Sequence, residues 1–397
     1  MTILEQMAEG LAAAPKLSST TARLGIHLLD TVAAWIAGRA TEEGARLAGL
    51  QSPSRSPFPL FSDHPLDCVT LACATIRLTE IDDIHMPSCT TPSSVVVPTA
   101  LFFSAAQSPP APPQSFAESL RAGYEAMTRF GQAIDGPHIV YRGLWPTYFA
   151  APMGVAAVAA RLLNLDAAKT ANALGIALAA ASGAPGGPSS PSPRWLLLGL
   201  AARAGCTAAL AAAEGYSCDR TLLDGDWLAS THGLACDTSK LIASSEQTEA
   251  AAALSIKPYC AAKQCIAAIE ASRQIFDQGI SPGEIARLRV AVPPAYSAMI
   301  GHHHARNGRV PRITSAAYNI ALAAYEPREL PNVARPDRTS NPKLPLSWSA
   351  SKSRPMTSSR LIIRTSGPPV PTPPCATAKL SQASYWMPPV TLPAPST

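Results

Sequence analysis

The chain has 397 residues, of which 47% are hydrophobic and 15% are charged. This composition is too apolar for a disordered chain, and the length favours two domains over a single core. The formal net charge of +5 does not indicate a nucleic-acid partner, because residues 331–397 hold eight basic residues and one acid, Asp337. The rest of the chain has 24 basic and 26 acidic residues and no basic stripe.

Cysteine usage and the N-terminus predict a soluble cytoplasmic protein. The nine cysteines are odd in number and scattered, which is typical of reduced thiols rather than of a disulfide framework. The first residues include Glu5 and Glu9 but no basic segment, so we expect no signal peptide. Apolar runs such as Ala171–Ala181 are shorter than the ~20 residues of a membrane span and predict buried helices.

The first two-thirds of the chain predicts one helix after another, joined by short loops. Thr20 or Thr21 is expected to cap a helix that ends near Gly38. Further helices are expected from the capping-box residues Ser115 and Glu118 to about Gly131, from about Pro152 through Leu162, from Asp166 to Gly183, and from about Trp195 to Gly215. Long apolar helices of this kind favour a bundle over a βαβ fold.

The pattern changes near residue 255, where a second, smaller α+β domain is predicted. A helix is expected after Lys257–Cys260, followed by a turn at residues 281–284. Leu288, Val290 and Val292 then alternate with their neighbours, which predicts a strand with one polar face.

A third change occurs near residue 331. Residues 331–397 contain fourteen prolines, one glycine and no clear helical or strand period beyond a short run at Leu361–Ile363. Such a composition does not readily form a packed core. One hypothesis is a naturally disordered tail, and the other, which we favour, is a shifted reading frame.

Seven stretches of the sequence carry motifs that occur together, in this order, in one known family. They are Leu29–Gly38, Glu80–His85 with Thr91–Pro98, Gly123–Glu125 with Arg129, Tyr141–Thr147, Ala173–Ala177, Ile256–Cys260 and Ser315–Asn319. Each is a weak motif alone, but together they span about residues 20–328. In this order they resemble the MmgE/PrpD family, which includes 2-methylcitrate dehydratase and cis-aconitate decarboxylase.

The resemblance implies a mainly α fold with a large helical domain and a smaller α+β lid domain. We therefore expect a helical domain at residues 1–254, a partial lid domain at 255–330 and an atypical tail at 331–397. The resemblance ends near Leu330, where the lid should continue with further strands, and this is the reason for favouring a shifted frame. It also implies a homodimer that handles small polycarboxylates without a metal or nucleotide cofactor.

Asp82, Asp83 and His85 are the predicted acid/base residues. Adjacent carboxylates and a histidine can shift one another's pKa values toward neutrality, as proton transfer beside a carboxylate requires. The alternative interpretation is a cluster at a helix end in which Asp82 or Asp83 is only a cap.

Other residues are assigned mainly by the resemblance. Lys257 matches a lysine at the lid boundary that is expected to face the substrate, and Tyr318 matches a tyrosine whose phenol can donate to it. A solvated lysine and a structural tyrosine are the alternatives. Further residues are expected to bind the acid groups: Thr91, Arg142, Arg194, Lys263 and Arg312.

The sequence also departs from the family. Thr91 and Trp145 stand where many members have histidines, and another family histidine is replaced near Cys265. If those histidines carry the family's dehydration or decarboxylation step, this chain performs another reaction, such as isomerisation, or none. Cys89 and Cys265 are candidates to replace them, although buried, inert cysteines are the favoured interpretation.

Two motif-like segments are not assigned a cofactor. His302-His303-His304 lacks acidic or cysteine partners at ligand spacing, so a basic lid loop with Arg306, Arg309 and Arg312 is favoured over a metal site. Residues 183–187 are not a phosphate loop, because no GK[ST] follows.

The leading hypothesis is a cofactor-independent lyase or isomerase of small di- or tricarboxylic acids. The alternative is a catalytically inactive protein of the same fold that binds only an acid or a partner subunit.

Overall fold

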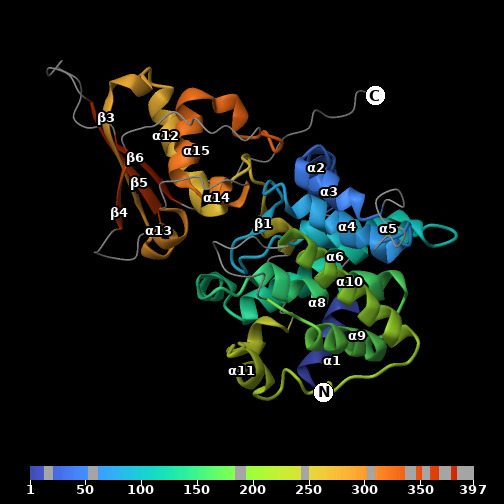
Figure 1. Cartoon of the computed structure of the whole chain (residues 1–397). Helices are drawn as coiled ribbons and strands as arrows, with labels where there is room; N and C mark the ends of the chain where they lie inside the picture. The colour runs from blue at the N-terminus through green and yellow to red at the C-terminus, as the bar shows by residue number, and fades with distance from the viewer. Residues whose placement is uncertain are drawn as a thin grey trace, which may run out of the picture. The chain divides into compact units, whose positions relative to one another are not determined.

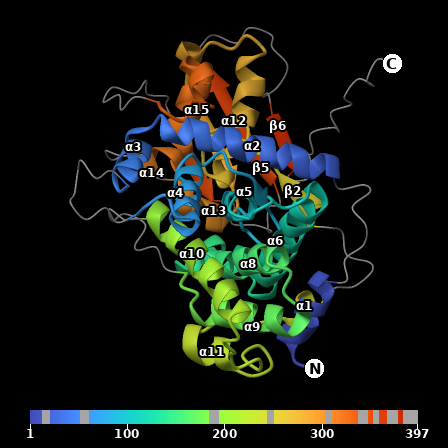
Figure 2. The same ribbon diagram turned by 90° about the vertical axis from the view of Figure 1, so that its right-hand side faces the viewer.

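The computed structural model describes residues 1–12, 21–51, 61–183, 194–242, 250–301, 309–335, 346–350, 358–365 and 377–381. The chain forms two compact units, Met1–Pro258 and Tyr259–Thr397. Both are drawn in Figures 1 and 2. The fold is mainly α-helical, as predicted, and the division lies close to the change of pattern expected near residue 255.

The first unit is built almost entirely from helices. Its strands form one two-stranded antiparallel sheet, β1 (Ile84–His85) with β2 (Leu254–Ser255). The α-helices are α1 (Ile3–Ala12), α2 (Thr21–Arg39), α3 (Glu42–Gly49), α4 (Pro65–Arg77), α5 (Ser93–Ala105), α6 (Pro113–Ala133), α7 (Gly136–Ile139), α8 (Pro146–Leu162), α9 (Ala167–Ala179), α10 (Arg194–Ala213) and α11 (Trp227–His232). Short 3₁₀ turns lie at Val140–Arg142, Thr238–Lys240 and Ala250–Ala253.

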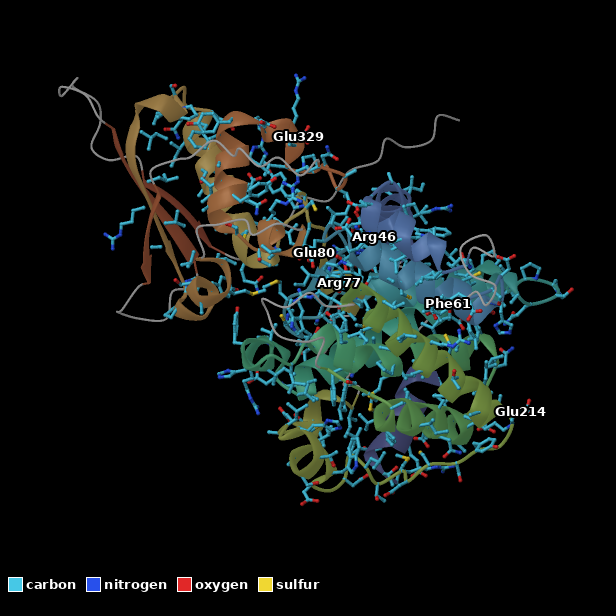
Figure 3. All side chains as sticks on the ribbon, in the orientation of Figure 1. Arg46, Phe61, Arg77, Glu80, Glu214 and Glu329 are labelled. Carbon is cyan, nitrogen blue, oxygen red and sulfur yellow. The ribbon has the colours of Figure 1, made fainter. Side chains whose placement is uncertain are left out.

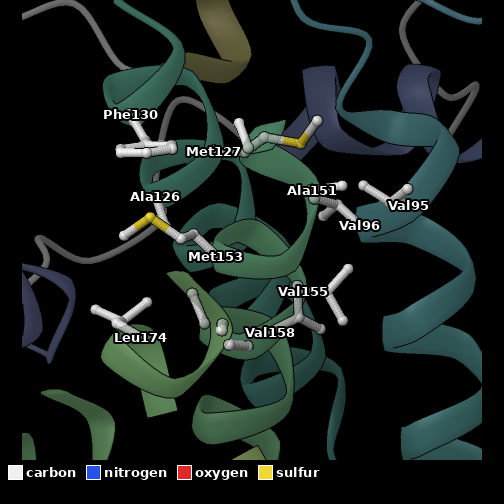
Figure 4. Close-up of a cluster of buried hydrophobic side chains, with 14 of the residues drawn as sticks. Val95, Val96, Ala126, Met127, Phe130, Ala151, Met153, Val155, Val158 and Leu174 are labelled. Atoms are coloured by element: carbon white, nitrogen blue, oxygen red, sulfur yellow. The ribbon is translucent and has the colours of Figure 1, made fainter. Parts of the chain in front are cut away.

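Helix α8 lies at the centre of this unit and packs against α5, α6, α9 and α10. Figure 4 shows Met127 of α6 with Met153, Val155 and Val158 of α8 in the buried core. Small residues let these helices approach closely, since a Cβ added at Gly154 would lie 2.7 Å from Met127 Cβ. The alanine-rich composition is therefore what permits the tight packing.

Most helices form where the sequence predicts them, but two start signals were wrong. Asp166 caps α9 as expected, because its side chain accepts a hydrogen bond from Lys169 N at 2.7 Å. Ser115 does not cap α6, which begins two residues earlier at Pro113. Pro152 does not begin α8, which starts at Pro146 and continues through Pro152. Proline is favoured in the first turn, and in each case an earlier proline takes that position.

The second unit combines helices with a four-stranded sheet. The helices are α12 (Lys263–Phe276), α13 (Pro294–Ile300), α14 (Arg309–Ile313) and α15 (Ala316–Tyr325), and short 3₁₀ turns lie at Pro282–Glu284 and Pro327–Glu329. The strands are β3 (Ile285–Val292), β4 (Leu346–Ala350), β5 (Ser358–Thr365) and β6 (Thr377–Ser381). The sheet order is β4-β3-β5-β6, with β4 parallel to β3 and the other neighbouring pairs antiparallel.

Helices α12 and α15 pack together, and α12 also contacts β5 and β6. Buried Leu288 and Val290 on β3 pack with Ile266 and Ile269 of α12. The alternation that predicted a strand at residues 288–292 is therefore confirmed.

Three strands lie within the described parts of residues 331–397, where the sequence showed no clear strand period beyond Leu361–Ile363. β5 is longer than that run, and β4 and β6 pair with the same sheet. Register with a partner strand, such as Val290 opposite both Trp348 and Leu361, is a long-range property that a local pattern does not reveal.

Candidate functional site

The turn after α4 gathers buried charges of both signs. Arg77 ends α4, and its guanidinium lies 2.9 Å from Glu80 Oε1 and 2.9 Å from Asp82 Oδ1. Figure 3 labels Arg77 and Glu80 at this turn. Glu80 has a φ of +58°, a left-handed conformation that is uncommon for a residue with a side chain. The chain reverses direction there, which lets two carboxylates from one short segment reach the same arginine.

The β1–β2 ladder brings Lys257 to the same place, although Lys257 lies 175 residues after Asp82. Ile84 of β1 is opposite Ser255 of β2, and Lys257 follows two residues later. Its Nζ lies 3.3 Å from Asp82 Oδ1 and 3.6 Å from Glu80 Oε2. We call these four residues, Arg77, Glu80, Asp82 and Lys257, the charge cluster; all are buried.

The two carboxyl groups of the charge cluster differ in their proton affinity. Burial alone would raise the pKa of Glu80, but Arg77 and Lys257 lower it below its usual value. Burial raises the pKa of Asp82 despite the opposing effect of the same two cations. Among the described residues, Asp82 Oδ2 has no hydrogen-bond partner. Asp82 is therefore the member of this cluster best suited to exchange a proton.

Asp83 lies in a network of hydrogen-bond donors instead. Its Oδ1 accepts from Ser93 N at 3.2 Å, and its Oδ2 accepts from Ser93 Oγ. His27 Nδ1 lies 3.0 Å from the same Oδ2. The Ser93 hydroxyl is also 2.8 Å from Tyr124 OH. Because both oxygens of Asp83 are engaged, its carboxylate is held in one orientation.

Asp30, on the same helix as His27, is a second carboxyl group that interacts electrostatically with Asp83. Burial, with the nearby Asp83 charge, raises the pKa of Asp30 from 3.8 to about 7. The sequence analysis did not select Asp30 or His27, although their spacing of three residues on α2 places them on one helix face. His27 also lies four residues before buried Thr31, and this helical spacing of three and four residues is the signal that could have found them.

His85 is held by the loop that follows β1. Its Nδ1 lies 2.8 Å from Ser88 Oγ, which is 2.7 Å from Thr90 Oγ1. A Cβ added at Gly131 of α6 would lie 2.8 Å from both Ser88 Cβ and Thr90 Cγ2, so glycine permits the loop to pack there. Burial lowers the pKa of His85 to about 4, against the opposing charges of Glu125 and Asp83. The imidazole is therefore neutral near pH 7.

Arg194 begins α10 and is buried against aromatic rings. Its Cζ lies 4.3 Å from the centroid of Trp145, and Trp145 is in edge contact with Tyr148, with ring centroids 6.3 Å apart. Burial lowers the pKa of Arg194. Arg194 also interacts electrostatically with Glu80 and Tyr148, which places it near the charge cluster.

The structure thus brings four predicted residues close to one another in the first unit: Asp82, Asp83, Lys257 and, through its interaction with Asp83, His85. Residues that the sequence analysis missed complete their surroundings: Arg77, Glu80, His27, Asp30, Ser93, Tyr124 and Tyr148. Arg77 is followed by Glu80 and Asp82 within six positions at a helix end, and this combination of one cation with two acids could have identified them.

Other predicted residues lie elsewhere or have different partners. Thr91 is buried, and its backbone N donates to Thr147 Oγ1 at 3.1 Å. Arg142 is exposed and donates to the carbonyl of Gly233 at 3.2 Å. The rest belong to the second unit: Lys263 begins α12, Arg312 lies in α14, and Tyr318 lies in α15 under the guanidinium of Arg335.

The two cysteines considered as replacements for histidine are protonated near neutral pH. Burial raises the pKa of Cys89 to about 11, and it raises the pKa of Cys265 further. Such thiols are poor acid/base groups at pH 7.

Within the described parts of the chain, no group of three or more His, Cys, Asp or Glu side chains is arranged to hold a metal ion. His302, His303 and His304 lie outside the described residues, as do residues 184–187 of the glycine-rich segment.

Helix α10 is the one described helix that is long and apolar enough to cross a membrane. Core helices pass the same test, so this is weak evidence for a span. α10 packs against α4, α8 and α9, and ten of its residues are buried in the first unit.

Comparison with known proteins agrees with this architecture. No curated protein matches the chain. The sequence model of the MmgE/PrpD N-terminal domain matches residues 4–235, which is more than half of the chain and covers most of the helical unit. The chain therefore belongs to the MmgE/PrpD family.

Proposed function

We propose that this protein is a cofactor-independent lyase or isomerase that acts on small di- or tricarboxylic acids in the cytoplasm. Membership of a family that includes dehydratases makes an enzyme plausible. The observation that carries the proposal is Asp82, a buried carboxyl group with a raised pKa, one oxygen held by two cations and the other without a partner among the described residues. Such a group can accept a proton from carbon and return it.

The proposed reaction begins with removal of a proton from the carbon beside a substrate carboxylate. The C–H bond breaks, Asp82 Oδ2 takes the proton, and the electron pair delocalises onto the neighbouring carboxylate. Arg194 supplies positive charge for that group, and Lys257 adds to it once Asp82 is protonated and no longer compensates the charge of the ammonium. A lyase then expels a leaving group from the adjacent carbon, whereas an isomerase of an unsaturated acid returns the proton from Asp82 to another carbon over which the electron pair is spread.

His85 and Asp83 have different proposed roles. His85 is neutral near pH 7, with Nδ1 against Ser88, so its Nε2 is the nitrogen that can exchange a proton with a substrate or leaving group. Asp83 fixes the segment that carries both Asp82 and His85. Roles for Tyr318, Lys263, Arg312 and Thr91 in substrate binding rest on the family resemblance.

The rival proposal is a protein that binds an acid without turning it over. It is supported by Trp145, a non-titrating side chain at a position where many family members have histidine. Both proposals predict binding, and they differ in whether a C–H bond is broken.

The experiment that separates them is proton NMR in deuterated water with 2-methylcitrate, citrate and cis-aconitate. Turnover, or replacement of a C–H proton by deuterium, is expected with the natural sequence. Asp82→Asn should reduce that rate by about 100-fold or more, because amide nitrogen and oxygen do not act as a base near pH 7.

Asp63→Asn is the matched control, because Asp63 is exposed in the same part of the chain. An undiminished rate in Asp82→Asn would remove Asp82 from the mechanism. No exchange with any of these acids by a folded, acid-binding protein would favour the rival.

We also propose a homodimer, on the basis of the resemblance and of α2. Ile26, Leu29 and Ile36 are 46%, 71% and 66% exposed and lie at helical spacing on that helix. A dimer mass in light scattering, converted to a monomer by Leu29→Glu with Ile36→Glu, is expected. A monomer of the natural sequence at micromolar concentration would contradict the proposal.

A further inference from the structure

Three buried cations lie in the first unit near the candidate site: Arg77, Lys257 and Arg194. Two of them are already neutralised. Arg77 and Lys257 both contact Glu80 and Asp82, at distances of 2.9–3.6 Å, so two cations face two carboxylates. A negatively charged ligand gains little from cations whose charge is already compensated.

Arg194 differs from the other two. It is 5% exposed, yet no carboxylate in the described residues lies within 4.0 Å of its guanidinium nitrogens. Its guanidinium lies over the Trp145 ring instead, at 4.3 Å. A buried charge without a counter-ion is costly, and the lowered pKa of Arg194 reflects that cost. The arrangement is expected where the counter-ion is supplied by a ligand.

Tyr148 is the second unsatisfied group at this place. It is 2% exposed, and its hydroxyl has no hydrogen-bond partner among the described residues. Burial raises its pKa, so the phenol stays protonated and is available as a donor. Tyr148 touches the edge of Trp145 and interacts electrostatically with Arg194, so both groups are next to the same indole.

We propose that Arg194 and Tyr148 form a subsite for a single carboxylate group, in which the guanidinium supplies the counter-charge and the Tyr148 hydroxyl donates a hydrogen bond. This rests on the proposed acid substrate and adds Tyr148 as a substrate-binding residue. A carboxylate has acceptor sites for a bidentate guanidinium and one further donor. The flat Trp145 ring keeps the guanidinium plane in place for that contact.

The alternative is that Tyr148 is a structural residue of the helical core. The two explanations predict opposite results for Tyr148→Phe in the absence of ligand. Removing an unpaired buried hydroxyl leaves the ring packing intact and should leave stability unchanged or higher. Removing a hydroxyl that makes structural hydrogen bonds should lower stability.

The test measures binding of succinate by isothermal titration calorimetry and the urea midpoint without ligand. Tyr148→Phe is expected to weaken binding by at least about tenfold, since a hydrogen bond to a charged group is lost. Arg194→Gln should weaken it by about 100-fold or more. Tyr216→Phe, at a tyrosine that is 69% exposed, is the control and should bind as the natural sequence does.

The subsite is supported if Tyr148→Phe loses affinity while its urea midpoint is unchanged or raised. It is overturned if Tyr148→Phe binds succinate as tightly as the natural sequence, if its urea midpoint falls, or if the natural sequence does not bind succinate. Because binding needs no turnover, these outcomes are separate from the proposed reaction. Binding that follows the expected pattern without deuterium exchange would contradict the reaction and leave the subsite intact.

Discussion

Asp82 and Asp83 are neighbours in the sequence, but their carboxylates lie in different surroundings. Asp82 faces the guanidinium of Arg77 and the ammonium of Lys257, and one of its oxygens has no partner in the described structure. Asp83 faces Ser93 and His27, which engage both of its oxygens.

The difference shows that a run of acidic residues is not one functional unit. A carboxylate that keeps a free oxygen near compensating cations can gain and lose a proton. A carboxylate whose oxygens accept several hydrogen bonds is a fixed acceptor that orients its neighbours. We therefore expect substitutions of Asp82 and its cation partners to change the reaction rate and the balance of buried charges. Substitutions of Asp83 and its hydrogen-bond donors should instead change the stability of the fold.

The largest effect on stability is expected from Lys257→Met. It leaves Glu80 and Asp82 buried with Arg77 as their remaining cation, which should lower the free energy of unfolding by about 3–5 kcal/mol. Urea denaturation measures the change, with Lys240→Met at an exposed lysine as the control. Adding Glu80→Gln should recover part of the loss, and a double variant no more stable than Lys257→Met would contradict the charge balance described here.

Asp83→Asn is expected to lower the free energy of unfolding by a smaller amount, about 1–3 kcal/mol. The new amide group cannot accept all the hydrogen bonds that the carboxylate accepts. This substitution should impair deuterium exchange less than Asp82→Asn does. If Asp83→Asn abolished deuterium exchange but had the same urea midpoint as the natural sequence, the assignment of different roles to Asp82 and Asp83 would be wrong.

The pH dependence of stability should show two opposing contributions. The pKa of Asp30 is raised from 3.8 to about 7, so its stabilising contribution is complete below pH 3.8 and is lost as pH rises toward 7. The pKa of His85 is lowered from 6.5 to about 4, so its contribution is present above pH 6.5 and is lost as pH falls toward 4.

Between pH 4 and 6.5, Asp30→Asn should therefore make stability rise more steeply with pH, and His85→Gln should make it rise less steeply. Urea midpoints across this range measure both slopes, and Asp63→Asn should leave the slope unchanged. Equal slopes in all three variants would show that neither group has the shifted pKa.

The smallest effect is expected from Ser88→Ala, which removes the hydroxyl beside His85 Nδ1. The free energy of unfolding should fall by about 1 kcal/mol, which is typical of one hydrogen bond. Ser230→Ala, at an exposed serine, is the control. A loss no larger than that of the control would show that Ser88 does not hold the histidine.

Much of the helical fold is encoded locally. Apolar spacing predicted α2, α9 and α10, and Asp166 was correctly identified as a cap. The errors at Ser115 and Pro152 share one cause, because an upstream proline can begin a helix and make a later start signal irrelevant. Strand pairs involving β4 and β6 were missed because register depends on partners far along the chain.

The sequence by itself determined the family, the helical character and the nomination of Asp82, Asp83, His85 and Lys257. Only the tertiary structure decided that Asp82 Oδ2 has no partner among the described residues, whereas both oxygens of Asp83 accept hydrogen bonds. It likewise decided that Arg194, unlike Arg77 and Lys257, has no carboxylate partner among the described residues. The physical reason is that pKa values, ion pairs and unsatisfied hydrogen bonds depend on neighbours in space. Here the β1–β2 ladder brings Lys257 to Asp82, which lies 175 positions earlier in the chain.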